Sequence, residues 1–165
     1  MNFFIPETVL KYIRYWPPYF FSGVSVDHFD LSKRTVTSKL TMSFWNQNYF
    51  GTHFGGSLFS MCDPFYVFIL AHHLGRGYYV WDKTSEIEFI KAVNEPVYAT
   101  FSFTEQEIEL IFEKTKEGKK YEPKVSTIVQ TKDGVIVAKV KKTLYIKKKR
   151  PISEKLASSG EKLTQ

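Results

Sequence analysis

One carboxylate, Asp63, lies inside the most apolar stretch of the chain. Residues 48–75 begin with a turn-rich approach that contains Gly55 and Gly56, and then become almost entirely apolar. A buried carboxylate is costly unless it is paired, hydrogen-bonded or open to solvent, and acids with perturbed ionisation gather at functional sites. Asp63 is therefore either a structural carboxylate that bridges locally or an acid that faces a ligand.

The glycine pair suggests a second element of the same chemistry. The first N–H groups of a helix have no partner within the helix, and glycine allows a substrate carbonyl to approach them closely. A single donor of this kind can contribute roughly 10²–10³ in rate by stabilising an oxyanion. Close packing of a helix against a sheet explains a pair such as Gly55-Gly56 about equally well, so both interpretations stay open.

The spacing between Gly56 and Asp63 limits how the two could act together. Asp63 follows Gly56 by seven residues, which corresponds to about 10 Å along a helix that rises roughly 1.5 Å per residue. A catalytic acid must come within about 3 Å of the group it serves. Asp63 therefore cannot reach a carbonyl bound at the start of its own helix, and joint action predicts at least a dimer with shared sites.

Other common chemistries find no support in the residue types. The only cysteine, Cys62, lies in the apolar stretch, where it cannot form an internal disulfide and is expected to fill the core. His72 and His73 are adjacent and would project from different faces of a helix. We therefore expect no metal site and no cofactor. A phosphate-binding P-loop and a serine-elbow motif are both missing from the sequence.

Composition indicates one globular domain. The chain has 165 residues, of which 43% are hydrophobic, and it contains 15 Phe and 10 Tyr. So many rings suit a filled core, a buried interface or an apolar ligand tunnel. The first residues carry Glu7, Lys11 and Arg14 within their apolar part, which is unlike a signal peptide. We therefore expect a cytoplasmic protein that does not insert into a membrane.

The positive charge is concentrated at one end of the chain. Residues 147–165 carry four of the six net positive charges. A basic face spread over a fold would indicate nucleic-acid binding, and this distribution predicts no nucleic-acid partner. We expect a single domain over residues 1–148 and a basic, disordered tail over residues 149–165.

Two helical segments frame the expected core. The stretch 48–75 is apolar all round, so its helix must be buried on all sides, and Pro64 should kink it. A curved sheet is the economical cover for such a helix. Near the N-terminus, Pro6 and the apolar residues that follow it at helical spacing predict a short helix that Pro17-Pro18 stops.

Period-two alternation predicts most of the sheet. Strands are expected over residues 24–29, 35–44, 78–93, 97–103, 124–131 and 135–148, and the last two form a hairpin across Lys132-Asp133-Gly134. Within 78–93, Trp81, Ile87 and Phe89 are expected to share a face. The segment Thr104–Glu107 matches a capping box and predicts a helix that ends near Gly118; a strand over 106–112 is the alternative.

These elements predict an α+β fold in which an antiparallel sheet of five or six strands wraps around one long central helix, with a short helix at the N-terminus. The central motif consists of Asn48, Gly51, Thr52, Gly55-Gly56 and Asp63, and the stretches Val80–Lys83 and Val140–Tyr145 add to it. Over residues 10–148 the chain resembles the hotdog fold of the acyl-CoA thioesterases. The nearest branches are the phenylacetic-acid-degradation thioesterases and a thioesterase-related domain of unknown function.

The resemblance implies roles for particular residues. The N–H of Gly56 or Gly55 would polarise the thioester carbonyl, Asp63 would activate water or attack directly, and Asn48 would position the substrate. In the family a histidine often precedes the two glycines; here that position is Phe54, and His53 comes one residue earlier. The substrate-binding candidates are Gly55, His53, Phe54, Trp81 and Lys83.

The resemblance therefore implies hydrolysis of acyl-CoA or a related acyl thioester at a site shared between the subunits of a homodimer or a dimer of dimers. Two alternatives remain open. One is a non-catalytic hotdog domain that binds an acyl group or another hydrophobic ligand, which Phe54 in the histidine position favours. The other is a structural or regulatory dimer module.

Overall fold

The structure is a computed structural model that describes residues 7–149. The basic tail expected over residues 149–165 lies outside the described residues except for Lys149. The expectation of disorder there, and the position of Pro6 at a helix start, therefore remain predictions.

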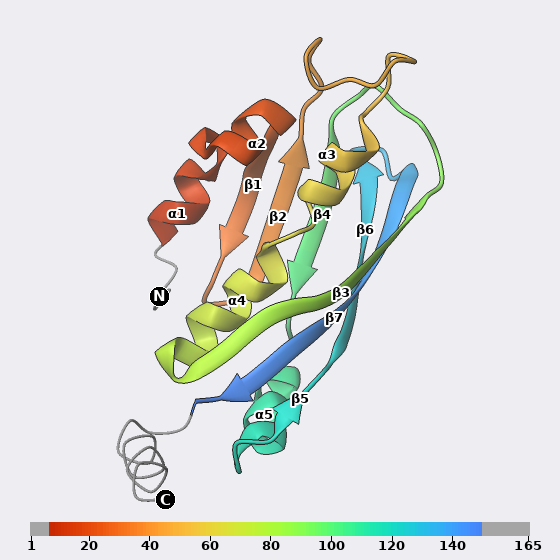
Figure 1. The fold of residues 1–165 in the computed structure, drawn as a ribbon. Coiled ribbons are helices and arrows are strands. Elements are labelled where there is room, and N and C mark those ends of the chain that lie inside the picture. The colour runs from red at the N-terminus through yellow and green to blue at the C-terminus, as the bar shows by residue number, and fades with distance from the viewer. Residues whose placement is uncertain (1–6, 150–165) are drawn as a thin grey trace, which may run out of the picture.

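Seven strands form one antiparallel sheet (Figure 1). Six of them follow the order β1-β2-β4-β6-β7-β3, and the two-residue strand β5 pairs with β7 beside this path. This agrees with the expected sheet of five or six strands, to which the structure adds the short strand β5. The strands are β1 (Val24–Asp30), β2 (Thr35–Leu40), β3 (Tyr78–Phe89), β4 (Val97–Ser102), β5 (Lys120–Tyr121), β6 (Lys124–Thr131) and β7 (Ile136–Lys148).

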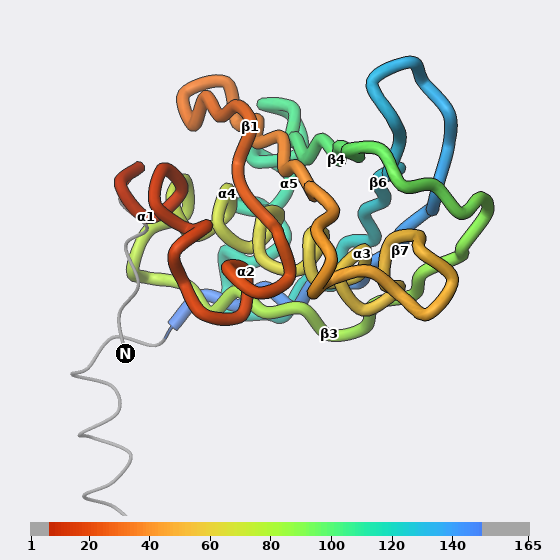
Figure 2. The backbone as a smooth tube through the Cα atoms, turned by 90° about the horizontal axis from the view of Figure 1, so that it is seen from above, coloured from red at the N-terminus to blue at the C-terminus, as the bar shows by residue number. Residues whose placement is uncertain are grey.

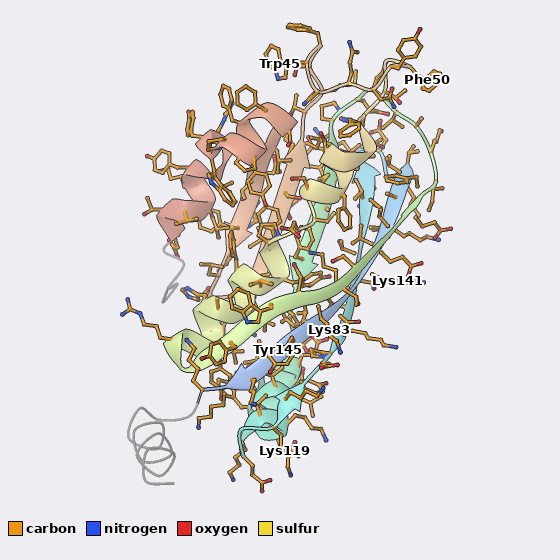
Figure 3. The ribbon with its side chains drawn as sticks, viewed as in Figure 1. Trp45, Phe50, Lys83, Lys119, Lys141 and Tyr145 are labelled. Atoms are coloured by element: carbon orange, nitrogen blue, oxygen red, sulfur yellow. The ribbon has the colours of Figure 1, made fainter. Side chains whose placement is uncertain are left out.

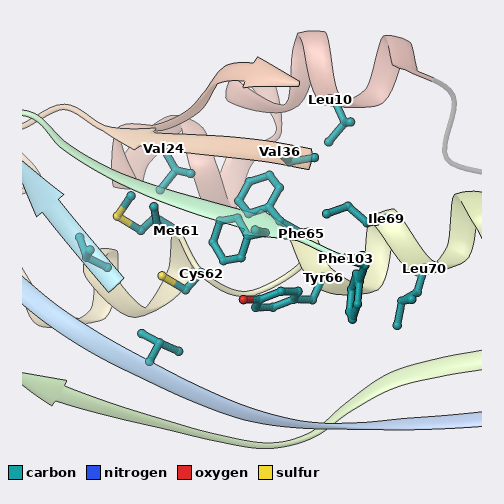
Figure 4. Close-up of a cluster of buried hydrophobic side chains, with 14 of the residues drawn as sticks. Leu10, Val24, Val36, Met61, Cys62, Phe65, Tyr66, Ile69, Leu70 and Phe103 are labelled. Atoms are coloured by element: carbon teal, nitrogen blue, oxygen red, sulfur yellow. The ribbon is translucent and has the colours of Figure 1, made fainter. Parts of the chain in front are cut away.

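The sheet curls around the central helical segment, as Figure 2 shows from above. This segment consists of α3 (Gly55–Ser60) and α4 (Phe65–Leu74). Their apolar side chains pack with inward-facing strand residues into one continuous core (Figure 4). Phe65 and Ile69 of α4 and Phe101 of β4 are fully buried. The predicted α+β hotdog architecture is confirmed.

A tight turn divides the central helix at Pro64. The ring of Pro64 has no N–H to continue the hydrogen-bond ladder, and the carbonyl of Ser60 accepts from the N–H of Asp63 at 3.1 Å. The ladder resumes where the N–H of Phe68 donates to the carbonyl of Pro64 at 2.8 Å. The predicted kink is therefore a break into two helices, with Asp63 in the turn between them.

The N-terminal cover has more structure than the sequence indicated. Helix α1 (Glu7–Tyr12) passes into a 3-10 turn and then into α2 (Pro17–Ser22). Pro17-Pro18 stops the first helix as predicted, but it also begins a second one, because proline has no N–H to lose in the first helical turn.

Strand β2 ends earlier than predicted, at Leu40. The side chain of Asn46 interrupts the strand because its Oδ1 accepts from the N–H of Ser43 at 2.6 Å and its Nδ2 donates to the carbonyl of Thr41 at 3.0 Å. The prediction that the strand runs over residues 35–44 is therefore wrong in its last four residues, and Phe44 is 78% exposed. Figure 3 shows Trp45 and Phe50 on the loop that results.

A bulge in β3 changes which residues face the core. The pairing of β3 with β7 shifts between Asp82 and Thr84, so Trp81 lies opposite Tyr145 while Ile87 lies opposite Val140. Directly opposed residues project from the same face of a sheet, and Val140 is buried. The prediction that Trp81 shares a face with Ile87 and Phe89 is wrong because period-two counting does not survive an inserted residue.

Helix α5 (Glu105–Thr115) begins with the predicted capping box, and the strand alternative is not adopted. The N–H of Glu107 donates to Thr104 Oγ1 at 3.2 Å, and the N–H of Thr104 donates to Glu107 Oε2 at 2.7 Å.

We expect Thr104→Ala to lower the free energy of unfolding by about 1 kcal/mol, because the helix loses its N-cap acceptor. Chemical denaturation measures the change. Thr104→Ser keeps the hydroxyl and serves as the control; equal loss in both variants would contradict the role of the cap.

Candidate active site

Asp63 is open to solvent although its neighbours in the chain are buried. Its side chain is 61% exposed, while Cys62 and Phe65 are fully buried. The turn between α3 and α4 brings the carboxylate out of the apolar interior. It also leaves the main-chain carbonyl of Asp63 available to accept a hydrogen bond from another element. An exposed carboxylate at a break in a buried helix can act on a bound ligand.

Lys142 of β7 donates a hydrogen bond to this main-chain carbonyl. Its Nζ donates to the carbonyl oxygen of Asp63 at 2.5 Å and lies 3.6 Å from the carboxylate oxygen Oδ1. The Lys142 side chain is only 1% exposed, because it projects inward with Val140 and Leu144. Sequence reasoning missed this contact. The signal was present: Lys142 is in phase with the apolar residues on either side.

Asp82 completes a cluster of three charged groups. Its Oδ2 accepts from Lys142 Nζ at 2.9 Å, and its Oδ1 is buried and without a hydrogen-bond partner among the described residues. Burial raises the pKa of the Asp82 carboxyl; Lys142 opposes this shift and Asp63 adds to it. The β3 bulge sets this position, because Asp82 lies opposite the buried Leu144.

Two other titratable groups near Asp63, the Cys62 thiol and the Tyr19 hydroxyl, are held in their neutral forms. Burial raises the pKa of the Cys62 thiol to about 12 and also raises the pKa of the Tyr19 hydroxyl on α2. The thiolate is the nucleophilic form of cysteine, so Cys62 is inert at neutral pH, in agreement with its expected place in the core.

The beginning of α3 forms a separate group of candidate residues. Gly55 and Gly56 occupy the first two helical positions, and the carbonyl of Phe54 accepts from the N–H groups of Ser57 and Leu58 at 3.0 and 3.2 Å. A Cβ at Gly56 would collide with the Phe54 ring, and one at Gly55 would lie 3.1 Å from the Phe89 ring. The glycines therefore make room for aromatic rings. A pocket of about 350 Å³ adjoins Gly56, and its walls include Phe21, Trp45 and Phe54.

The side chain of Asn48 shapes the loop that precedes the glycines. Its Oδ1 accepts from the N–H groups of Phe50 and Thr52, and its Nδ2 donates to Thr52 Oγ1 at 2.7 Å and to the carbonyl of His53 at 3.2 Å. Asn48 therefore holds this turn together in the single chain.

His53 ties the same loop to the connection between β3 and β4. It is 4% exposed; its Nε2 lies 2.8 Å from the carbonyl oxygen of Glu95, and its N–H donates to the carbonyl of Val93 at 3.1 Å. These bonds bury His53 between the two segments, whereas the next residue, Phe54, is 54% exposed.

Trp81 and Lys83 lie on other surfaces. Lys83 Nζ pairs with Glu122 Oε2 at 2.6 Å. Figure 3 labels Lys83. Trp81 borders a groove of about 770 Å³ between the N-terminal helices, α4 and the start of β3. The lining of this groove is mostly apolar and includes Val9, Trp16, Phe68, Ala71 and Tyr78.

Within one chain the candidates therefore form two groups. Asp63, Asp82 and Lys142 meet at the turn after α3, whereas Gly55, Gly56 and Phe54 gather at its beginning, near Asn48 and His53. Helix α3 separates the groups. Because it ends at Ser60, before Asp63, the separation of about 10 Å, which assumes one continuous helix, stays a prediction.

Comparison with known proteins adds the family and the fold. The profile of a family described as a domain of unknown function (DUF4442) matches residues 7–146. No curated protein matches the sequence. Among the described residues, no helix is long and apolar enough to cross a membrane.

Several solved structures have the same fold. A Pseudomonas aeruginosa protein of unknown function, called a "probable thioesterase", has a TM-score of 0.77 at 14% identity, over 87% of this chain and 97% of that one. A Haemophilus influenzae thioesterase has a TM-score of 0.66 at 10% identity, over 92% and 96%. A hypothetical thioesterase from Streptococcus pneumoniae, solved with coenzyme A, has a TM-score of 0.55 at 17% identity, over 79% and 91%.

Proposed function

The chain belongs to the DUF4442 family of thioesterase-like hotdog domains, and from this we propose that it hydrolyses an acyl thioester, such as an acyl-CoA, at a site shared between two subunits. The observation that carries the proposal is the exposed carboxylate of Asp63, which lies at the break in the central helix, 3.6 Å from Lys142 Nζ. The coenzyme A bound to the Streptococcus pneumoniae neighbour supports CoA as the thiol part.

The proposed chemistry requires two protein groups. Asp63 takes a proton from water, and the water oxygen adds to the thioester carbonyl carbon. The negative charge that develops on the carbonyl oxygen is stabilised by the N–H of Gly56 or Gly55 of the other subunit. The intermediate then collapses, the C–S bond breaks, and the thiolate takes the proton from Asp63. Direct attack by Asp63, followed by hydrolysis of the resulting anhydride, is the other route that the resemblance implies.

The free edge of the sheet supports a second subunit. Strand β3 is 12 residues long and pairs only with β7 among the described strands. Trp81 and Phe89 on this strand are 61% and 57% exposed. A long edge strand with exposed aromatic residues is a template for pairing with another chain, so β3 offers a surface on which a partner could bring its own Gly56 toward Asp63.

A panel of acyl-CoAs tests the proposal. The purified protein should release CoA from at least one short, long or aromatic acyl-CoA, as detected with a thiol reagent. Asp63→Ala, prepared in parallel, measures any contaminating activity. Equal CoA release by both proteins, or by neither across the panel, would contradict hydrolysis at this site.

The groove beside Trp81 favours one alternative, a domain that binds an acyl group without hydrolysing it. Its volume of about 770 Å³ and mostly apolar lining suit a hydrophobic ligand. Mass spectrometry of the purified protein would decide between the functions: a co-purifying lipid together with a silent panel supports binding alone.

A further inference from the structure

Lys142 is a deeply buried charged side chain, and it contacts the candidate acid Asp63. Only 1% of its side chain is exposed, and burying an ammonium is costly unless its hydrogen bonds are satisfied. Two of its three donors are directed at the carbonyl of Asp63 and at Oδ2 of Asp82, at 2.5 and 2.9 Å. An apolar residue at this inward position would avoid the cost of burial, so the retained charge calls for an explanation.

We propose that Lys142 is a positioning residue for Asp63, and that Asp82 in turn fixes Lys142. The Nζ atom holds the turn after α3 through the main-chain carbonyl of Asp63, and its charge lies 3.6 Å from the Asp63 carboxylate. This inference rests on the proposed thioesterase function, because it assigns Asp63 the role of the catalytic acid.

The geometry accounts for both parts of this role. Proline at position 64 interrupts the helix, so the turn lacks a continuous hydrogen-bond ladder to fix it. Lys142 supplies a bond from the sheet to that turn. Asp82 Oδ2 in turn accepts from Lys142 Nζ at 2.9 Å and so fixes the lysine.

The surrounding charges agree with this assignment. The carboxylates of Asp63 and Asp82 face the single ammonium of Lys142, and the two other titratable groups nearby, Tyr19 and Cys62, are kept neutral by their raised pKa values. The cluster therefore consists of two carboxyl groups that share one lysine amine. The more exposed carboxylate is that of Asp63, at 61% against 22% for Asp82.

Lys142→Met tests the proposal, with Lys141→Met as its matched control. Lys141 precedes Lys142 on β7 and is exposed on the outer side of the sheet (Figure 3). We expect Lys142→Met to lower kcat by about 10²-fold, since a displacement of about 1 Å at a catalytic group has an effect of this size. KM should change little, so the loss should fall on kcat rather than on binding. Lys141→Met should leave both kcat and KM unchanged.

A double variant separates positioning from general support of the fold. If Lys142 acts through Asp63, Lys142→Met should cause no further loss of kcat in an Asp63→Asn background, because residues that act as a unit are not additive. An additive loss, or a wild-type kcat in folded Lys142→Met, would overturn the proposal. If Lys142→Met does not fold, Asp82→Asn replaces it, with an expected loss of about tenfold from the weakened charged hydrogen bond.

Hydrogen exchange tests positioning without turnover. The amides of Asp63 and of residues 65–68 should exchange faster in Lys142→Met than in the wild type, and Lys141→Met should show no change. A wild-type protein that hydrolyses no thioester overturns the proposed function, whereas unchanged exchange in Lys142→Met overturns the positioning role. The two failures are therefore distinguishable.

Discussion

Asp63→Asn is expected to lower kcat for the preferred acyl-CoA by about 10²–10⁴-fold, the range that a positioned acid or base contributes. Asparagine has the same shape but cannot accept the proton from water. The fold should be retained, because the side chain of Asp63 is 61% exposed and its main-chain carbonyl keeps the bond from Lys142. Steady-state release of CoA and thermal unfolding measure the two effects.

Asp133→Asn is the matched control for this prediction. Asp133 is an exposed aspartate in the turn between β6 and β7, where asparagine suits the turn equally well. Its kcat should equal that of the wild type. A folded Asp63→Asn protein that retained wild-type kcat would exclude Asp63 as the acid and base of the reaction.

The second large effect is expected from Gly56→Pro, which removes a backbone N–H that the proposal assigns to the oxyanion. Proline is tolerated in the first turn of a helix, and Gly56 is the second residue of α3. The loss of one such donor should lower kcat by roughly 10²–10³-fold. Gly56→Ala is the control: its Cβ also displaces the Phe54 ring, but it keeps the N–H and should lose far less.

Mixing the two inactive variants tests whether the site is shared. In a heterodimer of Gly56→Pro and Asp63→Asn, one site carries both changes and the other combines an intact Gly56 with an intact Asp63. Such a heterodimer should recover about half of the wild-type activity, because a two-fold dimer has two equivalent sites. Gly56→Pro mixed with the double variant should stay inactive. If the first mixture also stays inactive, the site lies within one subunit.

Most of the sheet was predictable because alternation is a local property. The hairpin of β6 and β7 was located from its Asp-Gly turn, and the capping box of α5 from four residues. The errors arose where a local feature interrupts the alternation. Asn46 ends β2 by bonding Thr41 and Ser43, and the β3 bulge turns Trp81 away from Ile87.

The candidate site divides in the same way. The position of the Asp63 carboxylate within an apolar stretch, and the effect of Pro64 on its helix, follow from residue types and spacing alone. The local hydrogen bonds of Asn48 and His53 required the structure, because both side chains are used within the loop that precedes α3. Whether they also contact a substrate remains a prediction.

The sequence by itself therefore determined a sheet wrapped around a central helical segment and an interruption at Pro64, since these depend on periodicity and residue type. That Gly56 and Asp63 act across two subunits remains a prediction. Only the tertiary structure decided what holds Asp63. Lys142 and Asp82 lie 79 and 19 residues away from it in the chain. Their meeting depends on the pairing of β3 with β7 and on the bulge after Asp82, because these set which side chains reach the turn after α3.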